Sequence, residues 1–345
     1  MSAERVAVAM SGGVDSSVAA ALLKASGYEV SGIHMKLGAD ATFNDTAALE
    51  RTCQQLGIPL YQVDLAREFR QMVIDYFCRE YGRGRTPNPC VACNQYLKFD
   101  ILLERALETG ADYFATGHYA RVEAGPEGYK LKKAFDAGKD QSYFLYTLGQ
   151  EQLKHLLLPL GELTKERVRT IASEMELPAV QRDSQDVCFI PGNDYRAFIA
   201  ANVPLRVGEI VDINSKVLGK HRGLALYTVG QRQGLGLTSA EPLYVLKIDA
   251  ASNKITVGSR EQALHNVLLA RSLSWVSGRS PDEPMEITAK IRYQAPEAAA
   301  ELYPDSDSAE VRFSEPQSAI APGQSIVFYR GEDVLGGGII DAVLY

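Results

Sequence analysis

The sequence lacks the features of membrane and secreted proteins. It holds no run of about 18 apolar residues and no basic leader followed by an apolar core and a cleavage site. Its five cysteines are an odd number, spaced unevenly along 345 residues, which argues against a disulfide framework. We therefore expect a protein of the cytoplasm, without a membrane partner, whose thiols are reactive or bind a metal.

An excess of positive charge is also absent. The net charge of −7 argues against a general polyanion binder, but it leaves room for a local basic face. Residues 206–235 carry more basic than acidic side chains: Arg206, Lys216, Lys220, Arg222 and Arg232 against Glu209 and Asp212. By itself such a stretch is usually a solvated loop, so charge alone predicts no nucleic acid.

The first half of the chain alternates apolar runs with amphipathic segments. We expect strands at residues 6–10, 28–37, 58–65 and 112–119, and helices at 14–23, 43–57, 66–82 and 96–111. This alternation predicts an α/β domain, residues 1–204, built on a doubly wound, mostly parallel sheet. Its ligand should lie at the carboxyl ends of the strands, where Met35 and Gly117 follow two of them.

The pattern changes near residue 205. Short alternating runs separated by Asn, Asp, Gly and Ser turns then continue to the end of the sequence, among them 208–219, 286–294 and 323–345. They predict a small central domain, residues 205–266, followed by a C-terminal β-barrel, residues 267–345. Small barrels often bind oligonucleotides, but a fold alone does not establish that function.

A glycine turn joins the first strand to the first helix. Two adjacent glycines, Gly12 and Gly13, allow the backbone N–H groups and the start of the helix to point at one spot, which suits a phosphate. The hydroxyls of Ser11, Ser16 and Ser17 add donors, and Asp15 places a carboxylate beside them. No lysine precedes Lys24, so this is not a Walker P-loop. A plain turn between strand and helix is the simpler alternative.

The cysteines suggest a second chemical site. Cys90 and Cys93 follow two prolines at the start of a helix, where the helix dipole is expected to lower the pKa of a thiol. A single Cys-x-x-Cys fits zinc, redox or iron–sulfur use, but zinc normally needs a second pair of ligands, which the sequence lacks. Taken alone, Cys188 is more typical of a core cysteine.

Seven motifs together resemble one family. S-G-G-V-D-S resembles the pyrophosphate loop of the ATP pyrophosphatases, which split ATP into AMP and pyrophosphate. The motifs occur in the order found in the bacterial tRNA-uridine 2-sulfurtransferases, the 2-thiouridylases of the wobble position, and the similarity runs almost the full length of the chain. They are S-G-G-V-D-S, G-R-T-P-N-P, C-N-x-x-x-K-F, A-T-G-H-Y-A-R, G-K-D-Q-S-Y-F-L-Y-T-L, D-S-Q-D-V-C-F-I and Y-T-V-G-Q-R-Q-G-L-G.

The resemblance implies an adenine nucleotide alpha hydrolase-like fold and ATP-dependent thiolation of tRNA. ATP would adenylate the C2 oxygen of uracil, pyrophosphate would leave, and sulfur would then replace the oxygen. Cys93 would be the nucleophile and Cys188 the persulfide carrier, paired afterwards in a transient disulfide. Asp15 would help to place Mg²⁺ or the pyrophosphate. The implied ATP site comprises Ala9, Met10, Ser11, Gly12, Gly13, Val14, Asp15, Ser16, Met35 and Gly117.

The resemblance also implies contacts with tRNA, whose target base must be extruded into a pocket. Asn88, Pro89 and Cys90 would lie beside that base. Further contacts are implied at His118, Lys139, Asp140, Gln141, Arg292, Tyr293 and Gln324. The alternatives are a capping or core position for the histidine and an ordinary barrel strand for Arg292 and Tyr293.

One departure from the family pattern leaves the mechanism open. Cys90 stands where the commoner pattern has Asp, so three thiols, Cys90, Cys93 and Cys188, are the potential ligands of a [4Fe–4S] cluster that carries hydrosulfide. The sulfur donor would be a persulfide carrier protein or sulfide. Two other functions stay open: an ATP pyrophosphatase that acts on a small molecule, and an RNA-binding protein without catalysis whose cysteines hold a structural metal.

Overall fold

A parallel sheet organises the N-terminal region of the computed structural model, which describes residues 3–38, 46–178, 187–190, 192 and 194–344. Its strands are β1 (Arg5–Ala9), β2 (Glu29–Lys36), β3 (Leu60–Asp64), β4 (Tyr113–Ala115) and β7 (Leu156–Leu157), in the order β3-β2-β1-β4-β7. All four pairings are parallel. The predicted parallel sheet is confirmed, with the strand that precedes the glycine turn at its centre.

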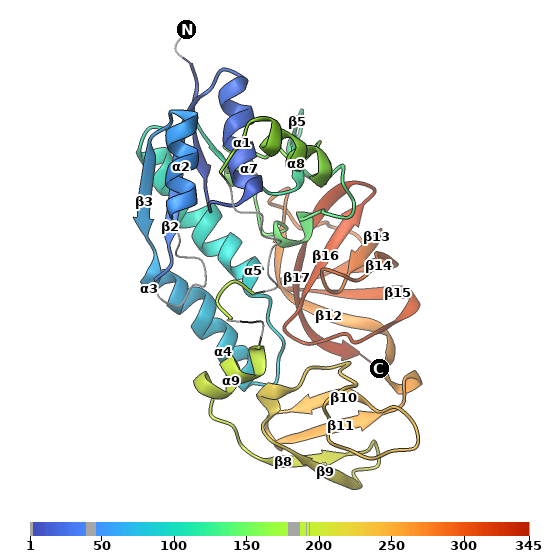
Figure 1. Ribbon diagram of the computed structural model, residues 1–345. Coiled ribbons are helices and arrows are strands. Elements are labelled where there is room, and N and C mark those ends of the chain that lie inside the picture. The colour runs from blue at the N-terminus through green and yellow to red at the C-terminus, as the bar shows by residue number, and fades with distance from the viewer. Residues whose placement is uncertain (1–2, 39–45, 179–186, 191, 193, 345) are drawn as a thin grey trace.

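Helices cover both faces of this sheet, as a doubly wound fold requires (Figure 1). On the face of Val6 and Val8 lie α1 (Val14–Ala25), α2 (Ala47–Leu56) and α8 (Lys165–Glu174). Ala7 points to the opposite face, where it shares a core with Phe99 and Phe114. The predicted helix at 43–57 is confirmed as α2, although its first residues, 43–45, lie outside the described part of the chain.

One long helix follows the carboxyl end of β3, and a second one leads back to the amino end of β4. One is formed by α3 (Ala66–Phe69), η1 (Arg70–Ile74) and α4 (Asp75–Gly82), and the other by α5 (Pro89–Ala92), η2 (Cys93–Leu102) and α6 (Leu103–Glu108). The second begins earlier than the predicted 96–111 because Asn88 caps it. The side chain of Asn88 accepts a hydrogen bond from the Val91 N–H at 3.3 Å, and Pro89 occupies the first turn.

The C-terminal region is a closed antiparallel barrel, as predicted. Its strands are β12 (Leu264–Trp275), β13 (Met285–Lys290), β14 (Ala298–Pro304), β15 (Ser308–Ser318), β16 (Ser325–Arg330) and β17 (Asp333–Leu344). The sheet closes because β12 pairs with both β15 and β17. The strand predicted at 286–294 ends at Lys290. There the Ala295 N–H donates to the Arg292 carbonyl and turns the chain.

A smaller sheet lies between these regions in the sequence and below the barrel in Figure 1. It comprises β8 (Gly208–Val211), β9 (Val217–His221), β10 (Tyr244–Asp249) and β11 (Lys254–Gly258), in the order β10-β11-β8-β9. Helix α9 (Tyr195–Asn202) precedes it. The remaining short helices are η3 (Ser142–Phe144), α7 (Gln150–Lys154), η5 (Leu224–Leu226) and η6 (Glu261–Ala263).

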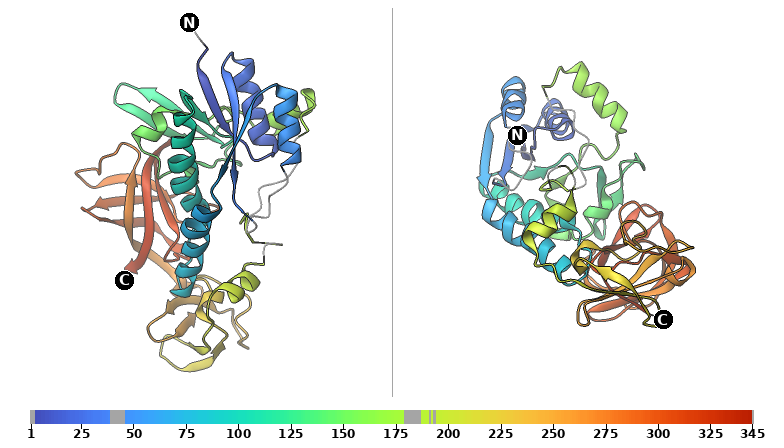
Figure 2. Two further views of the ribbon diagram at one scale, coloured as in Figure 1. Left: turned by 90° about the vertical axis from the view of Figure 1, so that its left-hand side faces the viewer. Right: turned by 60° about the horizontal axis from the view of Figure 1, so that its bottom comes forward.

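A hairpin from the N-terminal region extends the barrel sheet. It consists of β5 (Ala120–Gly125) and β6 (Gly128–Lys133), and β6 pairs with β17 through Lys132 and Asp333. Figure 2 shows the green hairpin beside the orange and red barrel strands. One continuous core runs through both regions, with Leu131 from the hairpin and Tyr329 from the barrel as members. No sequence pattern indicated this shared core.

Helices of the described residues are too short or too polar to span a bilayer.

Candidate functional site

The glycine turn has the geometry expected of an anion cradle. Gly12 adopts φ +79°, which favours glycine, and α1 starts directly after Gly13. Among the described residues no side chain caps α1, so the N–H groups of its first turn are available to an anion. The hydroxyls of Ser16 and Ser17 are committed to the Gly13 carbonyl, at 3.1 and 3.0 Å. The expectation that these two hydroxyls add free donors is therefore wrong, because they brace the turn instead.

Gly117 packs directly on this turn. A Cβ atom added to it would lie 2.8 Å from the Asp15 carbonyl carbon and 2.8 Å from the Ser16 nitrogen. Only glycine therefore lets the segment after β4 approach the turn so closely. Met35 lies two residues beyond Ile33, the register partner of Ala9, so it too is at the carboxyl edge of the sheet. Its side chain is half-buried and packs against two of the apolar clusters.

Asp15 is held by two residues that the sequence analysis did not identify. Lys165, the first residue of α8, brings its Nζ within 2.6 and 2.7 Å of the two Asp15 carboxylate oxygens. The Tyr119 hydroxyl donates to Asp15 Oδ1 at 2.8 Å. The turn that lacks a lysine of its own therefore has one supplied by a helix about 150 residues later.

A signal for Lys165 is present in the sequence. The positive end of the helix dipole disfavours a cation in the first turn, so a lysine at the first position of a helix is a local electrostatic conflict. Thr164 fixes that position, because its hydroxyl accepts the Arg167 N–H at 3.2 Å. Tyr119 lies within the motif A-T-G-H-Y-A-R, but no spacing rule links it to Asp15.

Two of the three cysteines of the predicted sulfur site lie on the second long helix, and Cys188 lies in a turn outside it. Cys90 is in α5, Cys93 opens η2, and Cys93 and Cys188 pack against the same apolar cluster. Phe189 anchors the Cys188 segment there: its ring centroid is 5.8 Å from that of Phe69 and 5.4 Å from that of Phe77. The rest of the D-S-Q-D motif, residues 183–186, lies outside the described part of the chain.

The Cys93 thiol affects the pKa of the Cys188 thiol. Burial, together with the nearby Cys93 and against an opposing effect of Lys98, raises the pKa of Cys188 to about 11. Burial also raises the pKa of Cys93, against an opposing effect of Lys98. The expected lowering by the helix dipole is therefore wrong for Cys93, because removal from water outweighs it. Cys53, Cys78 and Cys93 are free thiols.

The described residues do not fit a metal cluster. Within residues 3–38, 46–178, 187–190, 192 and 194–344, no group of three or more His, Cys, Asp or Glu side chains is arranged to hold a metal ion. Cys90, Cys93 and Cys188 all lie within these ranges. The arrangement of these thiols therefore does not support the [4Fe–4S] alternative.

Residues of the motif G-K-D-Q-S-Y-F-L-Y connect the sulfur site to the barrel. The Phe144 carbonyl accepts a hydrogen bond from Asn94 Nδ2 at 3.1 Å, and its ring lies 4.4 Å from that of Tyr293. The Tyr143 hydroxyl donates to the Ser325 carbonyl at 2.8 Å. A predicted RNA-contacting side chain of the barrel, Tyr293, is thus in contact with the segment that supports the helix of Cys93.

The same motif is connected to the glycine turn. Gln141 accepts the Tyr119 N–H through its side chain at 3.0 Å and donates its own N–H to the Tyr119 carbonyl at 2.8 Å. Asp140 is buried, and its carboxylate accepts hydrogen bonds from the Ala134 N–H, the Ser142 N–H and the Ser142 hydroxyl. Lys139, by contrast, is exposed.

The remaining predicted RNA contacts differ in exposure. His118 bonds Thr116 through Nδ1 at 2.7 Å and lies 5.7 Å from the Phe99 ring. Burial, assisted by Lys98, holds the pKa of His118 well below its usual range, so its ring is neutral. Arg292 is exposed in the turn after β13, and its Nη1 donates to the Ser318 carbonyl at 3.4 Å. Gln324 is half-buried beside β17, where its carbonyl accepts the Ile340 N–H.

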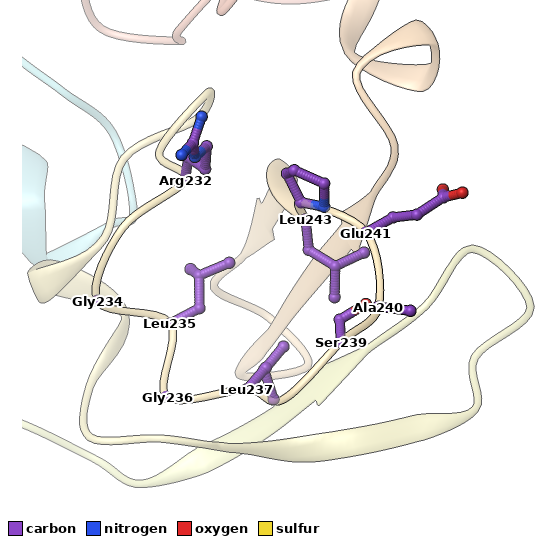
Figure 3. A pocket seen from close by; sticks show the side chains of 10 residues that line it. Arg232, Gly234, Leu235, Gly236, Leu237, Ser239, Ala240, Glu241 and Leu243 are labelled. Carbon is purple, nitrogen blue, oxygen red and sulfur yellow. The ribbon is translucent and has the colours of Figure 1, made fainter.

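A pocket of about 360 Å³ lies elsewhere, in the loop that leads to β10. Figure 3 shows Leu237 and Leu243 within the ring of this loop and Glu241 pointing away from it. A second pocket of about 390 Å³ lies at the amino edge of the parallel sheet, where Arg5 and Glu29 begin their strands. None of the predicted site residues lines either pocket.

Three family models match the chain in sequence. They are described as the tRNA methyl transferase HUP domain at residues 4–192, the tRNA methyl transferase PRC-barrel domain at 196–259 and the aminomethyltransferase beta-barrel domain at 265–340. Among solved structures, a 4-thiouridine synthetase–RNA complex with bound ATP is 17% identical and covers 58% of this chain and 50% of its own. Its TM-score of 0.37 is too low to carry an argument.

Curated relatives match over nearly the whole chain. The tRNA-specific 2-thiouridylase MnmA of Clostridium acetobutylicum is 45% identical over 98% of this chain and 99% of its own. MnmA 1 of Caldanaerobacter subterraneus subsp. tengcongensis is 48% identical, over 98% of each. The names of these relatives specify thiolation, whereas two of the family-model descriptions specify methyl transfer. Because the relatives match over nearly the whole chain, we assign the family by their names. The chain belongs to the family of the tRNA-specific 2-thiouridylases.

Proposed function

We propose that this chain is an ATP-dependent tRNA-uridine 2-sulfurtransferase that replaces the C2 oxygen of the wobble uridine by sulfur. One observation carries the proposal: Cys93 and Cys188 are 95 residues apart in sequence, yet they pack on one cluster and the charge of one thiol raises the pKa of the other. Two thiols so close can exchange sulfur and then form a disulfide. The glycine turn at the same edge of the sheet supplies the site for ATP.

Activation of the base is the first step. The C2 oxygen of uracil attacks the α-phosphorus of ATP, pyrophosphate leaves, and the base loses its N3 proton. The backbone from Ala9 to Ser16 holds the phosphates through its N–H groups, with Met35 and Gly117 completing the ATP site. This step converts an oxygen that leaves poorly into AMP, which leaves well.

Asp15 and Lys165 have complementary roles in this step, one toward a cation and the other toward the leaving anion. The carboxylate of Asp15 would help to hold Mg²⁺, which would screen the charge of the phosphates, and the ammonium of Lys165 moves from Asp15 to the departing pyrophosphate. The ion pair supports this role because a cation 2.6 Å from Asp15 lies beside the phosphate cradle. Such a cation stabilises the charge that develops as pyrophosphate leaves.

Sulfur transfer is the second step. An external donor, a persulfide carrier protein or sulfide with an oxidant, converts Cys188 to a persulfide. The terminal sulfur attacks C2 and AMP leaves, which gives a base–S–S–Cys188 adduct. The Cys93 thiolate then attacks the Cys188 sulfur, a Cys93–Cys188 disulfide forms, and the base departs with its sulfur and regains its N3 proton. An external thiol reductant restores both thiols.

The tRNA is bound across the three regions, for which we propose the limits 1–204, 205–266 and 267–345. Asn88, Pro89 and Cys90 lie beside the extruded base, and exposed Lys139 and Arg292 face the phosphates. Contact of Tyr293 with Phe144 supports this arrangement, since the Phe144 carbonyl in turn accepts a hydrogen bond from Asn94 in the helix of Cys93. His118, Asp140, Gln141 and Gln324 complete the RNA site by shaping its walls.

Two serine variants test the sulfur relay. Cys93→Ser and Cys188→Ser should each abolish 2-thiouridine formation from tRNA, ATP and a persulfide donor, while both still bind tRNA and release pyrophosphate. Cys78→Ser, which alters another half-buried thiol, is the matched control and should keep full activity. Full thiolation by either of the first two variants would overturn the assignment.

Metal analysis tests the alternative chemistry of the same thiols. Protein purified without oxygen should thiolate tRNA with a persulfide donor while containing less than one-tenth of an iron per chain. Stoichiometric iron and acid-labile sulfide, lost together with activity in Cys90→Ser, would replace the relay by a cluster mechanism. Stoichiometric zinc without thiolation would favour an RNA-binding protein with a structural metal.

A further inference from the structure

Arg85 uses its whole guanidinium group to join two regions of the chain. Its Nε lies 3.2 Å from Glu80 Oε2 in the N-terminal region. On the barrel side, Nη1 lies 3.1 Å from Asp341 Oδ1 and Nη2 donates to the Ile340 carbonyl at 3.1 Å. The Arg85 side chain is only 25% exposed, and that of Glu80 only 11%. A planar fork with three directed donors is specific to arginine, and a lysine cannot reproduce it.

Thr86 brings a third region to the same point. Its N–H donates to the Pro322 carbonyl of the barrel at 2.8 Å, and its hydroxyl lies 3.3 Å from that of Thr228 in the central region. A Cβ atom on Gly323, whose φ is +94°, would lie 2.8 Å from the Thr86 nitrogen. The barrel loop is therefore pressed against the segment between α4 and α5, which runs beside the barrel in Figure 1.

This segment leads directly into the sulfur site through stiff backbone. Between Arg85 and Cys93 the chain contains Pro87 and Pro89, whose rings fix φ, and the side chain of Asn88 caps α5. A displacement at Arg85 is consequently transmitted to Cys93 rather than absorbed by a flexible linker. The position of the thiol depends on where Arg85 is held.

The barrel side of the contact is equally well defined. The Gly323 N–H donates to the Ile340 carbonyl and the Ile340 N–H to the Gln324 carbonyl, both at 2.8 Å. Asp341 has a second, more exposed partner, Arg271, with Nε at 3.1 Å from Oδ2. Gln324 of the proposed RNA surface and Asp341 are therefore on paired backbone.

We infer that Arg85 and Asp341 form a positioning pair that couples engagement of tRNA by the barrel to the placement of the Cys93 thiol at the reacting base. Arg85 touches neither substrate, and its effect is exerted through the stiff segment 86–93. This inference rests on the proposed function, which assigns the sulfur chemistry to Cys93.

The test is the single-turnover thiolation rate at saturating tRNA and ATP, measured beside tRNA affinity and melting temperature. Arg85→Lys and Asp341→Asn should each lower the rate roughly tenfold or more, because misplacement of a reacting group is costly. Both should bind tRNA within about twofold of wild type, since neither removes a proposed RNA contact. Arg271→Met removes the other partner of Asp341 and should leave rate and affinity unchanged.

The double variant separates positioning from general damage. If Arg85 and Asp341 act as one pair, Arg85→Lys/Asp341→Asn should lose no more rate than the worse single variant. Full rates in both single variants, multiplicative losses in the double variant, or a loss of rate matched by an equal loss of tRNA affinity would each overturn the pair. Absence of thiolation in wild type would instead reject the proposed function, so the two failures are distinguishable.

Discussion

Asp15 joins three elements through one carboxylate. It lies in the first turn of α1, accepts the Tyr119 hydroxyl from the segment after β4 and pairs with Lys165 at the start of α8. Near a helix N-terminus a lysine costs about 0.3 to 1 kcal/mol, whereas the carboxylate of Asp15 is favoured in the first turn of its own helix. The position of Lys165 is therefore explained by its partner and not by its helix.

Replacement of Lys165 should slow the first chemical step. In Lys165→Met the departing pyrophosphate loses a cation, so its tRNA-dependent release should slow by roughly 10²-fold, the order found when one charge-stabilising donor is removed. Lys165→Arg keeps the charge and should recover part of the rate. Lys154→Met, at an exposed position, is the control. Equal rates for Lys165→Met and wild type would show that the ion pair is only structural.

The raised pKa of Cys188 predicts its reactivity. A thiol whose pKa is about 11 is protonated at neutral pH, so only a small fraction is thiolate there. Alkylation of Cys188 by iodoacetamide, followed by peptide mass spectrometry, should rise about tenfold per pH unit between pH 8 and pH 10. The same cysteine in the urea-unfolded chain should level off near its ordinary pKa. A plateau below pH 9 in the folded protein would contradict the burial seen here.

At the scale of elements, the close approach of the segment after β4 to the glycine turn has a measurable consequence. In Gly117→Ala the new methyl group meets the backbone of Asp15 and Ser16, and backbone cannot yield as a flexible side chain can. We expect a stability loss of about 1 to 3 kcal/mol, as for other overpacked positions, and a raised KM for ATP. Gly125→Ala adds a methyl group at an ordinary distance of 3.6 Å and should change neither quantity. Unchanged ATP kinetics in Gly117→Ala would separate this glycine from the ATP site.

Elements that depend on residues close together in the sequence were predictable from it. The glycine turn, the helix that follows it and the apolar strands β1 to β4 depend on neighbouring residues, and each was found. The pairing of Lys165 with Asp15 and of β6 with β17 depends on residues far apart, for which no local pattern exists. The pKa of Cys93 was misjudged for a related reason: the helix start is visible in the sequence, but the burial that dominates the shift is not.

At the scale of the whole molecule, the N-terminal region and the barrel share a core. Tyr143 and Tyr146 are fully buried, and both reach Ser325 of the barrel through their hydroxyls. The ring of Tyr329 lies beneath Lys133 of the hairpin, 4.6 Å from its Nζ. Neither region keeps this core intact when the other is removed.

A truncated chain should therefore fail to fold. Residues 1–263, which end before β12, would expose Tyr143, Tyr146 and Leu131 to water, at a cost of about 1.5 to 3 kcal/mol for each large side chain. We expect this fragment to be insoluble or to bind a hydrophobic dye, whereas the full chain unfolds in a single cooperative transition in urea. A soluble fragment with a sharp transition of its own would show that the N-terminal region is independent.

The shared sheet also has a consequence for folding during synthesis on the ribosome. Strand β6 is synthesised about 200 residues before β17, its partner. At ribosomal rates of roughly 5 to 20 residues per second, the edge of β6 stays unpaired for on the order of ten to forty seconds until β17 has been synthesised. Strand β6 carries three lysines, Lys130, Lys132 and Lys133. Charged side chains on an unpaired edge strand discourage pairing with other chains. The lysines that later meet Asp333 and Glu297 thus protect the nascent chain before those partners exist.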